Sequence, residues 1–131
     1  MPRLFKTICA ALIASCVAAP VVAGSALSPI GSWEVSTGEA RYKVTNCGKN
    51  GEICAKLIWL RDDARTKENL RYLNKNVVTG AVPASADNKW TGTVNYEGEA
   101  IRGSVTMVNN NTLKLTGCKM IACTSFQFRR I

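Results

Sequence analysis

Two stretches near opposite ends of the chain, residues 31–35 and 126–131, constrain the fold most, because both alternate in the manner of β-strands. A sheet that begins with the first stretch and ends with the second is able to close on itself. In the later stretch, the two-residue period of a strand places two aromatic rings and the guanidinium of Arg130 on one face. We therefore predict a closing contact between Trp33 and Arg130, made by cation–π and hydrogen-bond interactions. The alternative is an ordinary core tryptophan and a solvated terminal arginine.

Short alternating segments separated by turn residues occupy most of the chain between these two stretches. Turn chemistry falls at residues 36–38, 48–51, 97–99 and 109–111. The polar stretch 61–76 mixes both signs of charge and reads as a surface connection with one short helix. We predict an all-β fold, a small antiparallel up-and-down barrel of seven or eight strands. Closure removes the edge strands that a small β protein otherwise has to protect.

Residues 1–23 have the pattern of a secretion signal peptide, in which Arg3 and Lys6 precede an apolar stretch and a small-residue cleavage site. An alternative cleavage would leave a lipid on Cys16, as in bacterial lipoproteins. No later segment has the roughly 20 apolar residues of a membrane-spanning helix. We therefore expect residues 24–131 to form one domain that is periplasmic or secreted and has no transmembrane span.

Four cysteines lie beyond the predicted signal peptide, at positions 47, 54, 118 and 123. Three pairings are open to four cysteines. Strand alternation places Cys47 and Cys54 on the same outward face across a short turn, and it does the same for Cys118 and Cys123. We predict these two local disulfides, each of which stabilises the fold by about 2 to 3 kcal/mol. The chain has no Cys-x-x-Cys motif that would favour a redox or metal role.

The order of the aromatic, glycine and cysteine motifs resembles that of one bacterial family. In chain order the matching residues are Gly31 and Trp33, Cys47, Ile53 and Cys54, Ile58 to Leu60, Trp90 and Gly92, Leu113, Gly117 and Cys118, and Phe128 to Arg130. In this order the chain resembles DUF2147, a family of small exported bacterial proteins. It departs from the family at Asp63 and Asn69, which lack the accompanying prolines, and at the shortened turn 95–98. The resemblance implies a lipocalin-like (calycin-like) barrel in the cell envelope and supplies no agreed activity.

The chain contains no histidine, which removes the commonest general base and the commonest metal ligand. Asp62 and Asp63 lie beside Arg61 and Arg65, where a solvated salt-bridge cluster is the simpler interpretation. No phosphate-binding, calcium or zinc motif is present in the sequence. We therefore expect a protein that is not an enzyme, with no catalytic residues, no metal and no cofactor.

Large side chains at the predicted inward positions are candidates to line a cavity for an apolar ligand. They are Tyr42, Trp59, Trp90, Tyr96, Met107, Phe126 and Phe128. The same side chains would also fill the barrel, and in a chain of about 105 mature residues we expect a mostly filled interior.

The turn between the last two predicted strands carries Lys119, Met120 and Ile121. Exposed apolar side chains invite association, so a turn that only reverses the chain would ordinarily be polar. Either this tip packs back over the barrel mouth, or it contacts a partner or a lipid surface.

We predict a non-enzymatic periplasmic or cell-envelope protein that binds a ligand or partner of unknown identity. One alternative is an inhibitor of an envelope or host hydrolase, in which the rigid hairpin 118–123 inserts into a cleft. The other is a carrier of a small apolar ligand. Loss of Arg3 and Lys6, two of the positive charges, lowers the formal charge from +8 to +6. This charge permits an anionic envelope component or a protein as partner, while nucleic acid is not expected for an exported chain.

Overall fold

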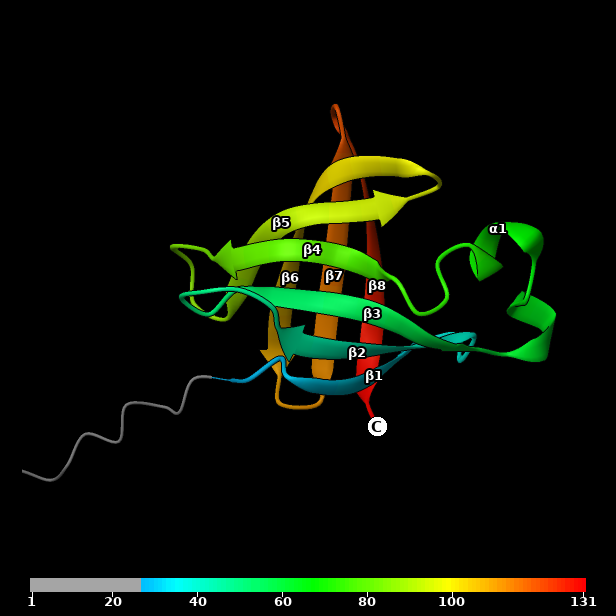
Figure 1. The fold of residues 1–131 in the computed structure, drawn as a ribbon. Coiled ribbons are helices and arrows are strands. Elements are labelled where there is room, and N and C mark those ends of the chain that lie inside the picture. Colours follow the sequence, from blue (N-terminus) through cyan, green and yellow to red (C-terminus); the bar gives the residue numbers. More distant parts are fainter. Residues whose placement is uncertain (1–26) are drawn as a thin grey trace, which may run out of the picture.

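The computed structural model of the chain describes residues 27–131. Eight strands form a closed barrel in which each pairs antiparallel with the next and β8 returns to β1 (Figure 1). In chain order they are β1 (Gly31–Val35), β2 (Ala40–Asn46), β3 (Ile53–Leu60), β4 (Asn76–Pro83), β5 (Lys89–Tyr96), β6 (Glu99–Asn109), β7 (Thr112–Lys119) and β8 (Ala122–Arg130). The predicted all-β up-and-down barrel is confirmed. The predicted signal peptide and Cys16 lie outside the described residues.

The contact between Trp33 and Arg130 closes the barrel as predicted. The two residues are partners in the β1–β8 register, and the guanidinium carbon of Arg130 lies 4.3 Å from the centroid of the Trp33 ring. The guanidinium also donates hydrogen bonds of 2.7, 2.9 and 2.8 Å to the carbonyls of Ser28, Ile30 and Asn110. A Cβ at position 31 would lie 2.8 Å from Arg130 Nη1, which is too close, so this position at the start of β1 requires glycine. Arg130 therefore ties the end of β8 to the segment that precedes β1 and to the β6–β7 turn.

This end of the barrel is closed by the side chains around Trp33, which is 1% exposed and donates its indole N–H to Pro29 O at 2.8 Å. Met107 is buried, and Leu27 and Trp90 pack against the same core. The opposite end carries the β1–β2, β5–β6 and β7–β8 turns and the connection between β3 and β4. The barrel thus has a packed floor and a rim made of loops.

A bulge in β3 reverses the side-chain alternation near the end of that strand. Tyr42 pairs with Leu57 whereas Arg41 pairs with Trp59, so Ile58 is an extra residue without a partner on β2. Beyond the bulge, Trp59 lies on the outer surface, where the guanidinium carbon of Arg41 is 4.3 Å from its ring centroid. The predicted inward position of Trp59 is therefore wrong, because the prediction continued a strict two-residue period through the bulge.

Both predicted disulfides are present. Cys47 is bonded to Cys54 across the β2–β3 turn, and Cys118 to Cys123 across the β7–β8 turn. Cys118 and Cys123 are also direct partners in the β7–β8 register. Each bridge joins neighbouring strands, so it rigidifies a hairpin.

The connection between β3 and β4 is the expected surface segment with little helix. It contains a 3₁₀ turn, η1 (Asp62–Ala64), and one helical turn, α1 (Lys67–Leu70). Thr66 caps α1 by accepting a hydrogen bond from the Asn69 N–H, and Asn69 Nδ2 donates to Ala64 O at 2.9 Å. Neither helical segment in residues 27–131 is long and apolar enough to cross a membrane.

Candidate functional site

The barrel contains a cavity of about 1110 Å³ that opens to solvent at the rim of loops. Its walls are mainly aliphatic and aromatic and include Val44, Ile53, Leu57, Val78, Leu113 and Phe128. All eight strands contribute lining residues, and so does the β3–β4 connection. The expectation of a mostly filled interior is wrong.

Four of the seven predicted lining residues border this cavity, and three do not. Tyr42, Tyr96, Phe126 and Phe128 line it, Trp90 and Met107 lie outside its lining and belong to the core, and Trp59 lies on the outer surface. The lining rings are paired along the wall: Tyr42 with Phe128 at a centroid distance of 5.4 Å, and Tyr96 with Phe126 at 6.0 Å. These two edge-to-face or tilted pairs lie along the wall, and Trp33 borders the cavity at the floor of the barrel.

The phenol of Tyr42 is a partly buried titratable group of the cavity wall. Burial raises its pKa above the ordinary value, and the nearby charge of Glu39 adds to this effect. Tyr42 is therefore neutral at physiological pH, and its hydroxyl is able to exchange hydrogen bonds with a bound molecule.

The rim of the cavity is polar and mainly acidic. Its carboxylates are those of Glu39, Glu68, Glu97 and Glu99, and its cationic side chains are those of Arg71 and Lys119. Lys119 Nζ lies 2.6 Å from Glu99 Oε2, an ion pair that raises the pKa of Lys119. Three rim carboxylates therefore remain against one cation outside this pair. An apolar chamber with this rim suits a molecule with an apolar body and a neutral or cationic end.

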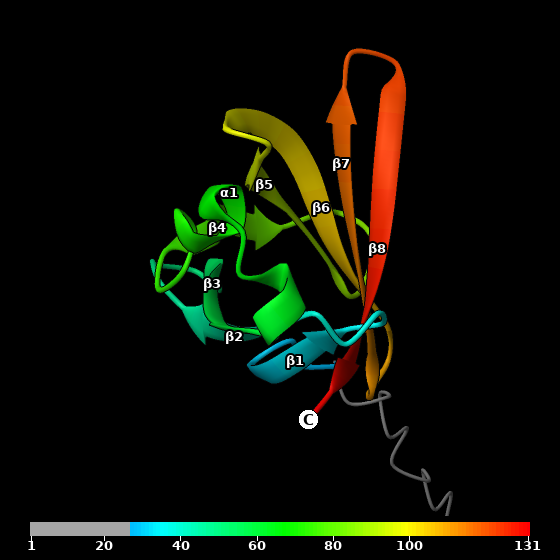
Figure 2. The same ribbon diagram turned by 90° about the vertical axis from the view of Figure 1, so that its right-hand side faces the viewer.

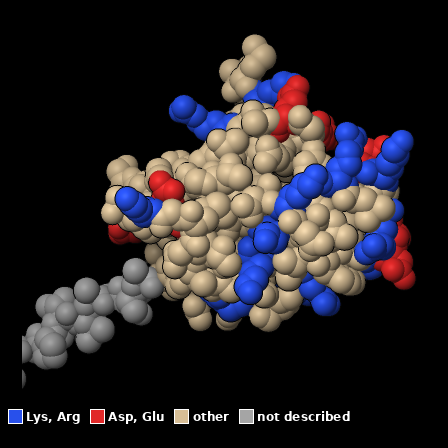
Figure 3. Space-filling view, viewed as in Figure 1, with Lys and Arg blue, Asp and Glu red and all other residues tan. Residues whose placement is uncertain are grey.

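The outer surface is basic by comparison, and Figure 3 shows a band of Lys and Arg side chains across one face of the molecule. Lys43 and Lys56 contribute to this basic surface as exposed, directly paired residues of β2 and β3. The rim of the cavity is therefore more acidic than the outer surface of the strands, which carries this basic band.

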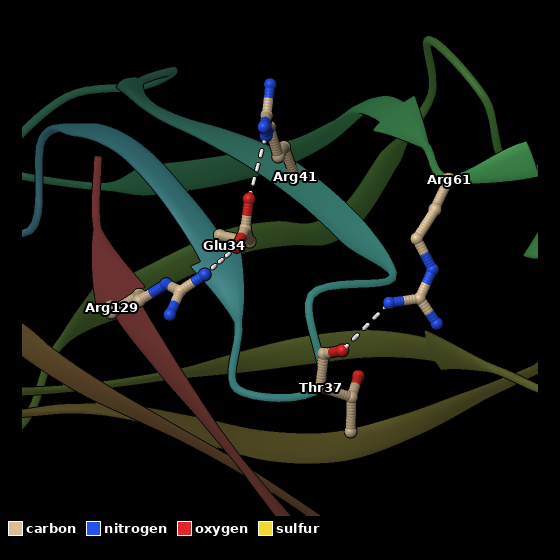
Figure 4. Close-up of polar contacts among 5 residues, drawn as sticks. All are labelled: Glu34, Thr37, Arg41, Arg61 and Arg129. Carbon is tan, nitrogen blue, oxygen red and sulfur yellow. Dashed lines mark hydrogen bonds and ion pairs between the residues drawn. The ribbon is translucent and has the colours of Figure 1, made fainter.

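A carboxylate at the β1–β8 seam is held by two arginines that the sequence analysis did not bring together. Glu34 of β1 is 6% exposed and forms ion pairs with Arg41 of β2, at 2.9 Å, and with Arg129 of β8 (Figure 4). Hydrogen bonds from Arg41 and then Arg129 hold the pKa of Glu34 below its usual value. The alternation of β1 places Glu34 on the outer face in the sequence pattern. Its pairing with Arg129 follows only once β8 is known to lie beside β1. The two arginines balance the negative charge of the ionised Glu34, which supports a structural role for this carboxylate.

Arg61 ties the β3–β4 connection to the turn between β1 and β2. Its Nη1 donates to Thr37 O at 3.2 Å (Figure 4), and its Nε and Nη2 donate to the carboxylate of Asp63 at 2.6 and 2.8 Å. The predicted salt-bridge cluster is thus present between Arg61 and Asp63, and the pair lowers the pKa of Asp63. Across the rim, the Gly98 N–H donates to the hydroxyl of Tyr72. These contacts hold loops at the mouth of the cavity.

The apolar tip between β7 and β8 stands clear of the cavity. Met120 is 94% exposed and Ile121 101% exposed, and Lys119 is held by Glu99. Figure 2 shows the β7–β8 hairpin rising beyond the rest of the barrel. The alternative in which this tip packs back over the mouth is therefore wrong. Elsewhere, residues 27–131 contain no cluster of three or more His, Cys, Asp or Glu side chains suited to a metal ion.

One family model matches the chain over residues 31–130, and it is described as "Uncharacterized protein conserved in bacteria (DUF2147)". The matched range begins at the first barrel strand and ends at the last. No curated protein and no solved structure matches the chain. The resemblance inferred from the order of motifs is confirmed.

Proposed function

Because the chain belongs to the bacterial family DUF2147, whose description names no activity, we propose a function from the geometry of the barrel. The protein is a non-enzymatic binding protein of the cell envelope that holds a small amphipathic molecule in a lipocalin-like cavity. The observation that carries this proposal is the cavity of about 1110 Å³ with aliphatic and aromatic walls. Ligand sites are typically chambers of about 300 to 1,000 Å³ with mostly apolar walls and a few polar groups.

The rim chemistry narrows the class of ligand. An anionic head group would lie among Glu39, Glu68 and Glu97, with Arg71 as the cation outside the Lys119–Glu99 pair. Repulsion between like charges disfavours binding of an anionic head group at this rim, whereas a neutral or cationic head group avoids the repulsion. The ligand we propose therefore has a single apolar chain or ring system and an uncharged or amine-bearing end.

A location in the periplasm or outside the cell fits the two disulfides, since disulfides persist in oxidising compartments. The signal-peptide pattern of residues 1–23 supports the same location. A carrier or sensor of amphipathic molecules would operate there between membranes or at a membrane surface.

Calorimetric titration with three dodecyl compounds below their micelle concentrations tests the proposal: dodecyltrimethylammonium, dodecyl maltoside and laurate. We expect saturable one-to-one binding in which the cationic and neutral compounds bind more tightly than laurate. The variant Leu115→Trp places an indole in the cavity and should weaken binding at least about tenfold. The matched control Val108→Trp adds the same ring on the exposed outer face and should bind normally. Equal binding by both variants, or no saturable binding of any compound, would refute the proposal.

A second candidate function is contact between the β7–β8 tip and a protein, such as an envelope or host hydrolase that the hairpin would inhibit. The near-complete exposure of Met120 and Ile121 favours it. A disulfide-closed hairpin loses little conformational entropy on docking.

A further inference from the structure

The last strand of the barrel has a free edge along most of its length. On the β1 side, β8 is paired only at Phe128, Arg129 and Arg130. One more contact follows, in which the Ser36 N–H donates to Gln127 O at 2.8 Å. Residues 122–127 are all exposed, and no strand among residues 27–131 pairs with 122–126 on this side. Figure 2 shows this part of β8 rising beyond the strands that surround its base.

The free edge presents a regular set of main-chain donors and acceptors. In an antiparallel strand, alternate residues direct their N–H and C=O groups to the same side. Because Gln127 O meets Ser36 on the β1 side, the N–H and C=O groups of Ser125 and Cys123 also face that side. The edge therefore offers two donors and two acceptors in a row, on a hairpin held rigid by the Cys118–Cys123 disulfide.

This edge lacks the features that usually prevent strand pairing. Natural edge strands carry charged residues, proline or bulges, or are covered by another segment. Residues 122–127 read Ala-Cys-Thr-Ser-Phe-Gln and contain no charged residue and no proline, and their register with β7 is regular from Lys119 and Ala122 to Thr112 and Arg129. An uncharged and regular exposed edge is a site for the addition of another strand.

We propose that the protein forms a two-fold symmetric dimer in which β8 pairs antiparallel with β8 of a second copy, centred on Thr124. The part of β8 that is free to pair with a second copy ends where Ser36 contacts Gln127 and, at the other end, at the turn that contains Met120. This leaves residues 122–126 as the window for pairing. The midpoint of that window is Thr124, so the window determines the register. Cys123 of each copy then exchanges two hydrogen bonds with Ser125 of the other.

The side chains of the window match a second copy. In this register Thr124 faces its own symmetry mate, and Phe126 faces the small side chain of Ala122, so no like charges oppose each other and no two large rings collide. The exposed Met120 and Ile121 at the tip come beside the β1–β2 turn of the second copy, which reduces their exposed apolar area. Such an isologous contact closes on itself and does not propagate into a fibre.

Sedimentation equilibrium of protein purified from expression of the full chain, over micromolar to millimolar concentrations, tests the dimer. We expect a reversible dimer. Thr124→Lys or Thr124→Glu alone should each raise the dissociation constant at least about tenfold, because two like charges then face each other across the two-fold axis. Mixing the two variants should restore association, with native mass spectrometry showing dimers that contain one copy of each.

Thr91→Lys is the matched control, because it adds the same charge to an exposed threonine of β5 remote from this edge. Thr91→Lys should leave the dimer intact. At a concentration low enough for every protein to be monomeric, all three variants should have the melting temperature of the wild type, since both threonine side chains are exposed. A wild-type protein that stays monomeric at every concentration overturns the proposal. So does an equal loss of dimer in Thr91→Lys, or a mixture of the two Thr124 variants that forms no mixed dimer.

Discussion

Two arginines that are adjacent in sequence play different parts at the seam where the barrel closes. Arg130 covers the Trp33 ring and donates to three carbonyls, whereas Arg129 reaches across the strand to Glu34. The first set of contacts joins β8 to the segment before β1 and to the β6–β7 turn at the floor of the barrel. The second balances a nearly buried carboxylate on its outer surface.

Replacing Arg130 with alanine should therefore destabilise the protein by about 2 kcal/mol, through loss of the cation–π contact with the buried Trp33 ring and of three hydrogen bonds to main-chain carbonyls. Arg129→Ala should cost less, because its side chain is 66% exposed and its ion pair is screened by water. Arg130→Lys keeps the positive charge but lacks the planar guanidinium that donates these hydrogen bonds. It should therefore recover less than half of the stability lost in Arg130→Ala. Chemical denaturation measures all three, and equal effects of the two alanine variants would contradict closure through Arg130.

Glu34 should make the stability of the barrel depend on pH. Its pKa is lowered in the folded state from an ordinary value of 4.5, by Arg41 and Arg129. A carboxylate of this kind stabilises the fold above its unfolded-state pKa, and the contribution is lost as the pH falls through the lower folded-state pKa. Glu34→Gln should thus be less stable than wild type at pH 7, and the difference should shrink below pH 4.5. A difference that is constant from pH 7 to pH 3, measured by urea denaturation, would show that the ion pairs are not its source.

At the scale of elements, the alternation of small apolar and polar residues was enough to predict the strands, their closure and both disulfide pairs. It did not predict the bulge at Ile58, because an extra residue changes the pairing without changing the composition of the strand. The side of the barrel on which Trp59 lies, and therefore part of the volume of the cavity, depends on that single residue. Contacts such as Glu34 with Arg129 join residues 95 positions apart and follow only from the closed topology.

The β7–β8 hairpin is the element whose exposed tip can be changed without disturbing the core. Changing Met120 and Ile121 together to serine should leave the melting temperature unchanged, because both side chains are almost fully exposed. If the tip contacts a protein or lipid surface, the double variant should lose that contact in an envelope co-sedimentation assay. A lowered melting temperature with unchanged co-sedimentation would instead assign these side chains to the fold.

For the whole molecule, the central feature is a barrel with a packed floor, an apolar chamber and an acidic rim. The floor could be predicted, since Trp33 and Arg130 lie on strands at the two ends of the chain. The chamber could not, because the same aromatic residues fit a filled barrel or a hollow one. Their positions along the wall, set by strand tilt and by the bulge in β3, decide between the two.

Native mass spectrometry of the protein purified from the cells that produce it tests the central claim most directly. We predict that the wild-type protein and Val108→Trp each carry one small molecule per chain, released on unfolding, and that Leu115→Trp carries none. The released molecule should be amphipathic, with a neutral or cationic end. A wild-type protein that is always free of ligand, or a Leu115→Trp variant that retains the same molecule, would contradict a ligand-binding cavity.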